Sequence, residues 1–387
     1  MRRRPLLPGL GLLALLWALV GPALTPVDGP DRTLCLTVLD VGQGDALLLD
    51  LPGAVWLVDG GGAPGSRRDV GESVVVPALR RRGVDRLDRV VLTHGDGDHI
   101  GGLFAVLEQL DVAELLVPTR RRLSSAERML LALAQRQGTE VLVADEGAPL
   151  GPLPGGAHGA LLHPRPDWEP PDPDDRNAGS VVFDVGLGGV DFLLTGDIEA
   201  ETEELLAAQG RVPRVAVLKL AHHGSRTSTT EAFLSRAAPL VAVAGAGRDN
   251  RFGFPHASVT GRLTEQGVPL YWTGRHGEVR VCTDGFEVSV AGGEQGALVR
   301  TFDAAEVASW RSELPVPVPV SPGLAADDER PKESKPRRRR PRRRSRKKAA
   351  KAAAEPEVEE APQLLDDRSW RRRRKSAAMK APWKGRR

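Results

Sequence analysis

The chain has 387 residues, of which 41% are hydrophobic, and a net charge of +3. Neither charge nor hydrophobicity is spread evenly, so the length alone does not indicate two average domains. Residues 321–387 contain 24 Lys and Arg against 10 Asp and Glu, a net charge of +14, so the rest of the chain carries −11. The composition therefore indicates one large acidic domain with appendages, the last of which is strongly basic.

The N-terminal segment has the composition of an export signal. Pro5–Val27 contains no charged residue and follows Arg2, Arg3 and Arg4, the order of a signal peptide's first two regions. The run also reaches the ~20 apolar residues that cross a bilayer, although its Gly and Pro residues weaken a permanent helix. A buried helix of the domain is a third alternative. We predict that residues 1–27 are a signal peptide or membrane anchor, and that the rest is exported across the inner membrane (periplasmic or extracellular) or anchored facing outward.

Strand-like and helix-like segments alternate through the first half of the domain. Three runs, each closed by Gly, Pro or Asp, predict a hairpin-rich sheet at 33–41, 45–51 and 54–61. Further strands are predicted at 88–93, 113–118 and 139–144, and helices at 73–82, 100–110 and 126–137.

The second half repeats this order. A hairpin is predicted at 179–197, a helix at 199–208, and strands at 214–225, 239–246, 268–274 and 277–290. Two strand-rich halves with interspersed helices predict an α/β (α+β) protein, a four-layer αββα sandwich with the sheets inside. We expect this domain to cover residues 32–292.

The C-terminal region has the composition of a disordered segment. Residues 313–387 begin with a Pro-rich linker, and 11 of the 15 residues in Arg337–Lys351 are basic. Such a run can bind polyanions through counterion release, so DNA or an anionic envelope polymer is an expected partner of residues 337–351. A solubilising extension without a partner is the alternative.

The two cysteines, Cys35 and Cys282, both lie in strand-like runs. We predict buried thiols for them rather than a disulfide.

The stretch "THGDGDHIGG" at Thr93–Gly102 carries the chemistry. His94, Asp96, Asp98 and His99 follow a predicted strand within six positions, and the glycines around them allow tight turns. Imidazole and carboxylate ligands together suit Zn, Mn and related ions. Two cations about 4 Å apart can activate water and stabilise charge on an ester or phosphoryl oxygen.

Further ligand types occur where later strands end. They are Asp197 in "TGD", His222 and His223 in "AHHGS" and His256 in "FPHAS". Neighbouring side chains of an extended segment point apart, so we expect one histidine of the pair to face a given ion. Asp40 and Asp45 flank a glycine turn, which we expect to support the metal loop. Asp59 is expected to orient a ligand.

These motifs, together with "LDVGQGDALLLDLPGAVWLVDGG", resemble the metallo-β-lactamase fold, and more narrowly the hydrolase domain of ComEC-type competence proteins. The resemblance covers about residues 32–290. It implies an αββα sandwich with a dinuclear site and hydrolytic chemistry, for which a nuclease or phosphodiesterase role is proposed in that family. The resemblance does not include the multi-span membrane channel of a full ComEC protein, so it does not imply a role in DNA transport.

Two departures bear on the ligands. Asp96 stands where the family-wide motif has a second His, and no convincing His ligand lies between His99 and Asp197, because His158 and His163 have incidental positions. We assign the missing imidazole to the His222/His223 pair, of which we favour His223. One ion is then expected at His94, Asp96 and His223, the other at Asp98, His99 and His256, with Asp197 between them.

The leading hypothesis is a phosphodiesterase or nuclease that uses two divalent ions, Zn or Mn. Asp98 is essential to it, and His222 or Lys219 stabilises the substrate oxyanion; for Lys219 an outward-directed side chain is the alternative. A second hypothesis keeps the site but hydrolyses small-molecule or cell-envelope esters, including phosphorylcholine-like esters. A third is a nucleic-acid- or polyanion-binding protein with a vestigial site.

Overall fold

The computed structural model describes residues 33–313, except 63–68, 119–122, 145–149, 151–152, 166–167, 169, 171, 173 and 294–295. The predicted signal or anchor at 1–27 and the basic tail lie outside the described residues. None of the described helices has the length and apolar character needed to cross a bilayer.

One sheet contains nine strands. In spatial order they are β15 (Ala297–Phe302), β14 (Val288–Gly292), β13 (Val279–Thr283), β1 (Leu34–Val38), β2 (Leu47–Leu51), β3 (Ala54–Val58), β4 (Arg86–Val91), β5 (Asp111–Val117) and β6 (Glu140–Val143). Pairing is antiparallel from β15 to β3 and parallel from β3 to β6.

The second sheet contains six strands. Their order is β12 (Leu270–Trp272), β11 (Val241–Ala244), β10 (Val217–Lys219), β9 (Val190–Leu194), β8 (Val182–Leu187) and β7 (Ala157–His163). Pairing is antiparallel from β7 to β9 and parallel from β9 to β12. Each sheet therefore combines a hairpin half with a parallel half.

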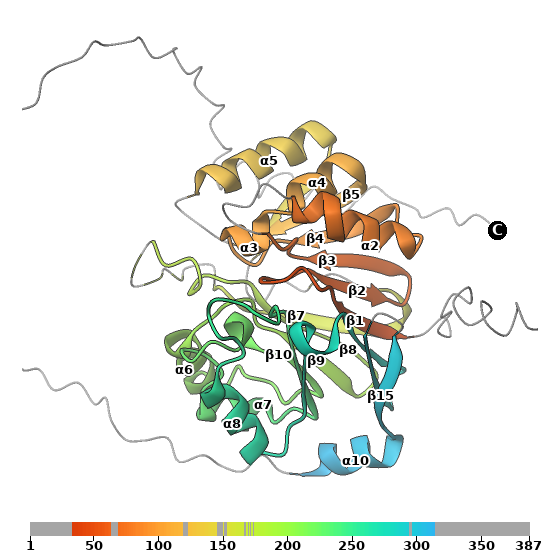
Figure 1. The fold of residues 1–387 in the computed structure, drawn as a ribbon, viewed down its shortest axis with the longest axis vertical. Coiled ribbons are helices and arrows are strands. Elements are labelled where there is room, and N and C mark those ends of the chain that lie inside the picture. The colour runs from red at the N-terminus through yellow and green to blue at the C-terminus, as the bar shows by residue number, and fades with distance from the viewer. Residues whose placement is uncertain are drawn as a thin grey trace, which may run out of the picture. The chain divides into compact units, whose positions relative to one another are not determined.

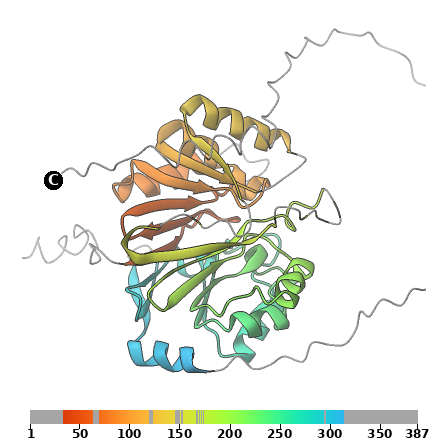
Figure 2. The ribbon, with the colours of Figure 1, turned by 180° about the vertical axis from the view of Figure 1, so that it is seen from behind.

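Alternation along the strands creates the layers. In β3, Trp56 and Val58 belong to the core between the sheets, whereas Leu57 faces the helices on the outside. The inner core also receives Phe183 and Phe192 from the six-stranded sheet. The sheets therefore pack face to face, as Figures 1 and 2 show from opposite sides.

Helices cover both outer faces. The nine-stranded sheet is covered by α2 (Val76–Arg81), which continues a π-helical turn at Gly71–Val75, and by α4 (Leu103–Gln109) and α5 (Ser125–Gln137). The six-stranded sheet is covered by α6 (Ala200–Ala208), α7 (Glu231–Ala237) and α8 (Ala257–Glu265). The predicted αββα sandwich is confirmed.

The folded chain extends past residue 292, where we expected the domain to end. Strand β15 pairs with β14, and α10 (Ala304–Ser312) follows it. Val307 and Trp310 of α10 are buried in the inner core, and the Trp310 indole donates a hydrogen bond to the Ala238 carbonyl at 2.7 Å. These two elements close the open end of the sandwich.

The prediction of free thiols was wrong, because Cys35 and Cys282 form a disulfide. They stand directly opposite each other on the antiparallel neighbours β1 and β13. Their sequence separation of 247 concealed this pairing, which only the sheet order reveals.

Candidate metal centre

The candidate site lies where parallel strands of both sheets end. Asp59 follows β3, and the segment from Thr93 to His99 follows β4 and enters the short helix α3 (Gly97–Ile100). Asp197 follows β9, and the His222–His223 pair follows β10. The carboxyl ends of parallel strands are the usual place for a binding site in such folds, because the loops that leave them converge there.

Three buried side chains meet at the centre of the site. His99 Nε2 lies 3.1 Å from Asp197 Oδ2, His223 Nε2 lies 3.2 Å from the same oxygen, and the two nitrogens are 3.3 Å apart. Asp98, partly exposed at the mouth, places Oδ2 3.7 Å from His223 Nε2. The Asp197 carboxylate thus contacts both imidazoles, and the Asp98 carboxylate lies beside them.

His94 offers a further ligand atom, Nε2. The neighbours of the ring determine which of its two nitrogens carries the proton. The Thr93 hydroxyl donates its one hydrogen to Asp59 Oδ2 at 2.6 Å, so it must accept from His94 Nδ1, 3.0 Å away. Burial, with a smaller contribution from the charge of His99, lowers the pKa of His94 well below its ordinary value, so the ring is neutral. Nε2 therefore carries the lone pair, and this fully buried atom has no hydrogen-bond partner among the described residues.

This arrangement fits a divalent cation. A buried polar atom without a partner is costly, and a lone pair directed into a cluster of carboxylates and imidazoles is the donor that Zn or Mn takes up. Asp197 Oδ1 is a second buried atom for which the described residues provide no partner. Asp96 Oδ2 lies 3.9 Å from His94 Nε2, close enough for both atoms to reach one ion.

Carboxylates outside the cluster orient the imidazoles. Asp59 accepts from His99 Nδ1 at 2.8 Å and from the Thr93 backbone N–H at 2.8 Å. Glu199 lies 2.8 Å from His222 Nδ1. Such contacts fix the ring orientation and raise the basicity of the ligand nitrogen. Asp59 thus has the supporting position that the sequence predicts.

Asp45 approaches the cluster from the opposite side of His223. It lies within 4.8 Å of the ligand atoms of His99, Asp197 and His223, so it could itself be counted as a ligand. However, its Oδ1 faces His223 Nδ1 at 3.3 Å, away from the nitrogen at the centre, and its Oδ2 forms an ion pair with Lys219. We therefore assign Asp45 to orienting His223.

The pKa values show how the cluster balances its charges. Burial alone would lower the pKa of His99, but Asp197 and Asp59 outweigh it and hold this pKa well above its ordinary value. Burial is likewise outweighed at His223, where Asp197 and Asp45 raise the pKa well above its ordinary value. The protons on His99 and His223 occupy positions that bound cations would take, so metal binding would release these protons.

The carboxylates shift in the complementary direction. Burial would raise the pKa of Asp197, but the charges of His223 and His99 hold it well below its ordinary value. At Asp98 burial is outweighed by the hydrogen bond from His223 and the charge of His99, so its pKa is lowered too. Both carboxylates are therefore ionised at neutral pH.

The pair in "AHHGS" does not adopt the extended conformation that we expected. His222 and His223 have φ angles of 48° and 55°, in the left-handed region, so the chain turns sharply after β10. His223 points into the cluster, whereas His222 stays at the rim with Nε2 3.9 Å from Asp197. The structure thus separates the two rings as the sequence predicts, by a different backbone geometry.

The predicted ligand His256 lies outside the cluster. His256 is the N-cap of α8, where its Nδ1 accepts from the Ser258 backbone N–H at 3.2 Å. Its backbone N–H donates to the Gly224 carbonyl, next to His223, but the contacts of its imidazole are with Ser258 and not with the cluster in the described structure. Its role as a ligand therefore stays a prediction.

Lys219 requires a correction. We expected its ammonium to contact substrate or to reach solvent, but the side chain is fully buried and its charge is paired with Asp45. The reason is that β10 lies in the middle of the six-stranded sheet, where the end of the strand faces the turn before β2.

The remaining histidines have partners elsewhere. His158 pairs with Asp191 and His163 bonds to the Ala178 carbonyl, in keeping with their incidental positions in the sequence. Sequence reasoning missed Arg176, whose guanidinium lies 3.0 Å from Asp96 Oδ1 at the mouth of the site. No sequence motif marks it, since it comes from the Pro- and Asp-rich loop.

Comparisons with known proteins agree with this geometry. Residues 39–248, more than half of the chain, match the sequence profile of the metallo-beta-lactamase superfamily. ComE operon protein 3 of Bacillus subtilis is 31% identical over 256 residues, covering 63% of this chain and 32% of that protein. Recombination protein 2 of Haemophilus influenzae is 34% identical over 245 residues, covering 63% of this chain and 28% of that protein.

The chain therefore spans about a third of the length of these relatives. Among solved structures, Igni18, a metallo hydrolase from Ignicoccus hospitalis, aligns with 64% of this chain and 98% of its own length, at 17% identity and a TM-score of 0.40. The sequence match, the sandwich and the histidine–aspartate cluster lead to one conclusion: the chain belongs to the metallo-β-lactamase superfamily, as a hydrolase similar to ComEC-type competence proteins.

Proposed function

We propose that this protein is a phosphodiesterase that cleaves nucleic acid with the help of two divalent ions, Zn or Mn. The observation that carries the proposal is the unpartnered Nε2 of His94 beside the group of His99, Asp197 and His223. Divalent ions held there supply Lewis acidity and a nucleophilic water at neutral pH. His94, His99, His223, Asp98 and Asp197 would hold the ions, together with Asp96.

The surroundings favour an anionic substrate over a neutral ester. Arg176 lies at the mouth with 41% of its side chain exposed, so its guanidinium can bind a phosphate oxygen while it stays near Asp96. His222 is also at the mouth, and Glu199 fixes its Nδ1 so that Nε2 is available to a substrate oxygen. One relative is named a recombination protein, and recombination acts on DNA.

The chain's own residues then have separate tasks. Asp59 and Asp45 keep the inner rings of His99 and His223 in place. Asp98 is ionised and partly exposed, so it would hold an ion at the mouth and can accept a hydrogen bond from the attacking water. His222 and Arg176 donate hydrogen bonds to the phosphoryl oxygens as negative charge develops.

Replacement of Asp98 tests this assignment. We expect Asp98→Ala to lower kcat by roughly a thousandfold or more, because a metal ligand and a hydrogen-bond acceptor for the attacking water are lost together. Turnover is measured on a bis-aryl phosphodiester, single-stranded DNA and a carboxylic ester, after chelation and after readdition of Zn or Mn. Full activity in the variant would exclude the mechanism.

Asp174→Ala is the matched control. Asp174 is an exposed aspartate of the neighbouring loop, so its removal should leave both turnover and bound metal unchanged. Hydrolysis of the carboxylic ester alone would support the ester hydrolase instead of the phosphodiesterase.

We also propose that the domain works outside the inner membrane. The disulfide between Cys35 and Cys282 supports this location, because such bonds persist in oxidising compartments. Trapping free thiols in intact cells and detecting the remaining disulfide would test it, and a fully reduced protein would contradict it.

A further inference from the structure

A cavity opens beside the metal centre. It has a volume of about 940 Å³, within the range of ligand-binding pockets. One wall is the end of α2 and the other is formed by residues 273–278, which include α9 (Thr273–His276). None of the residues grouped at the metal centre lines it.

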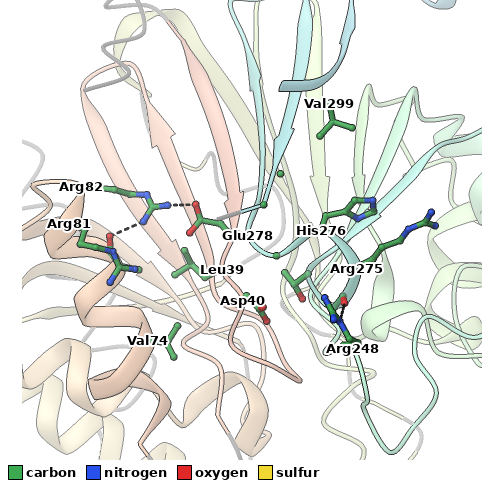
Figure 3. Close-up of a pocket in the computed structure, with 16 residues that line it drawn as sticks. Leu39, Asp40, Val74, Arg81, Arg82, Arg248, Arg275, His276, Glu278 and Val299 are labelled. Atoms are coloured by element: carbon green, nitrogen blue, oxygen red, sulfur yellow. Dashed lines mark hydrogen bonds and ion pairs between the residues drawn. The ribbon is translucent and has the colours of Figure 1, made fainter. Parts of the chain in front are cut away.

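Arginines surround this cavity. Figure 3 shows Arg81 and Arg82 on one side and Arg248 and Arg275 on the other, with Asp40 and Glu278 between them. We call it the arginine pocket. His276 adds no charge near neutral pH, because burial and, to a smaller extent, the charge of Arg275 lower its pKa.

The arginines differ in how much of their hydrogen-bonding capacity is used. Arg82 forms an ion pair with Glu278 and donates to the Ala78 carbonyl, so its charge is balanced. Arg248 uses only Nε, which donates to the Gly274 carbonyl at 3.1 Å, and both terminal nitrogens remain. Arg81 is exposed, and no hydrogen bond or ion pair engages it within the described part of the chain.

Arg275 is the third guanidinium with spare donors. It lies 5.5 Å from the centre of the Trp272 ring and is exposed. Against these three positive charges stands one unpaired carboxylate, Asp40, so the pocket retains a net positive charge. Guanidinium groups bind phosphate oxygens in a fork, and this geometry suits a phosphodiester.

The pocket and the metal centre share a wall. A Cβ on Gly245 would lie 2.8 Å from Asp45 Oδ1, beside the metal centre, and one on Gly247 would lie 3.2 Å from Gly42. Gly274, which lines the pocket, packs equally closely on the backbone of Gly247 and Arg248. The wall between the two sites is therefore formed by closely packed glycine backbone, at Gly245 and Gly247 and at Gly274.

We propose that the arginine pocket is a subsite for single-stranded nucleic acid, which binds phosphates away from the bond that is cleaved. This rests on the proposed function. A strand has regularly spaced phosphates, so it can occupy both sites at once, which a small diester cannot. Val74 and Val299 give the pocket an apolar surface for sugars and bases, and guanidinium planes stack on bases.

The test compares Arg81→Gln/Arg248→Gln with the wild-type full chain. Binding of a fluorescent dT20 oligonucleotide is measured in chelator, where no cleavage is needed, and turnover of a bis-aryl phosphodiester is measured with metal. We expect the Kd for the oligonucleotide to rise roughly tenfold, because one or two charge-assisted hydrogen bonds are lost. The slope of log Kd against log salt should fall by about 1.4, as for two phosphate contacts. Small-diester turnover should stay unchanged.

The control is Arg136→Gln/Arg236→Gln, which removes two charges from the outer helices α5 and α7. The basic tail is present in every variant and can itself bind DNA. Only the difference in Kd between the two double variants therefore reports on the pocket. Equal weakening by both doubles, or an unchanged Kd in the first, would overturn the subsite. Polyphosphate that competes as well as dT20 would overturn its assignment to nucleic acid.

The outcomes separate this inference from the proposed function. If no phosphodiester is hydrolysed but the pocket variant still loses oligonucleotide binding, the catalytic proposal fails and the subsite stands. If the small diester is hydrolysed and oligonucleotide binding is unaffected, the subsite alone fails.

Discussion

At the scale of single residues, the most informative pair is Lys219 and Asp45. Both are fully buried, and their charges compensate each other beside His223. Burial would raise the pKa of Asp45, but Lys219 and His223 together hold it below its ordinary value. The lysine therefore acts on the metal centre through the aspartate and not on the substrate.

This arrangement predicts the effect of Lys219→Met. The variant leaves the Asp45 carboxylate buried without its ion pair to Lys219, so the free energy of unfolding should fall by roughly 3–5 kcal/mol. Urea denaturation in the presence of a chelator measures it. The Asp45→Asn/Lys219→Met double variant should recover most of the loss, and additive losses would argue against the pair.

The histidines and aspartates of the cluster could be named from the sequence, because each lies shortly after an apolar run and close to a glycine. The partner of Lys219 and the contact between Arg176 and Asp96 could not. Both depend on which loops meet across the two sheets, and no local pattern encodes this.

At the scale of elements, the turn before β2 determines how the site is assembled. Gly44 packs against the loop after β4, where the Asp98 carbonyl accepts a hydrogen bond from the Asp45 backbone N–H at 3.2 Å. A Cβ on Gly44 would lie 2.1 Å from this carbonyl oxygen. The two loops can therefore approach only through a glycine.

Gly44→Ala should separate the loops that carry Asp45 and Asp98. Since displacement of a catalytic group by about 1 Å can cost a hundredfold in rate, we expect a loss in kcat of roughly that size. Gly42→Ala is the matched control, because Gly42 also has a positive φ, 81°, but open space around it. It should cost about 1–2 kcal/mol of stability and little activity. Equal activity in the two variants would contradict the steric argument.

Elements with a clear apolar period were predictable, and those without one were not. β7 lies at a sheet edge and begins with Ala157, His158 and Gly159, so the start of its sequence resembles a loop. α7 and α8 are short, and β15 and α10 follow a glycine-rich sequence that resembles the end of a domain. Their stability comes from packing onto the sandwich rather than from local preference.

At the scale of the whole molecule, the disulfide joins an early strand to a late one. Removing it in Cys35→Ser/Cys282→Ser should lower the free energy of unfolding by roughly 2–5 kcal/mol, because the unfolded chain gains freedom. Neither cysteine contacts a cluster residue in the described structure, so kcat should change little. Denaturation of the oxidised, reduced and substituted proteins measures this, and equal stability of all three would contradict it.

The same bond has a topological consequence. It closes the backbone from Cys35 to Cys282 into a covalent ring that contains every residue of the candidate metal centre and most of the arginine pocket. A single proteolytic cut inside this ring linearises it without releasing a fragment, so the nick is visible by electrophoresis only after reduction. Cuts before Cys35 or after Cys282 leave the ring intact.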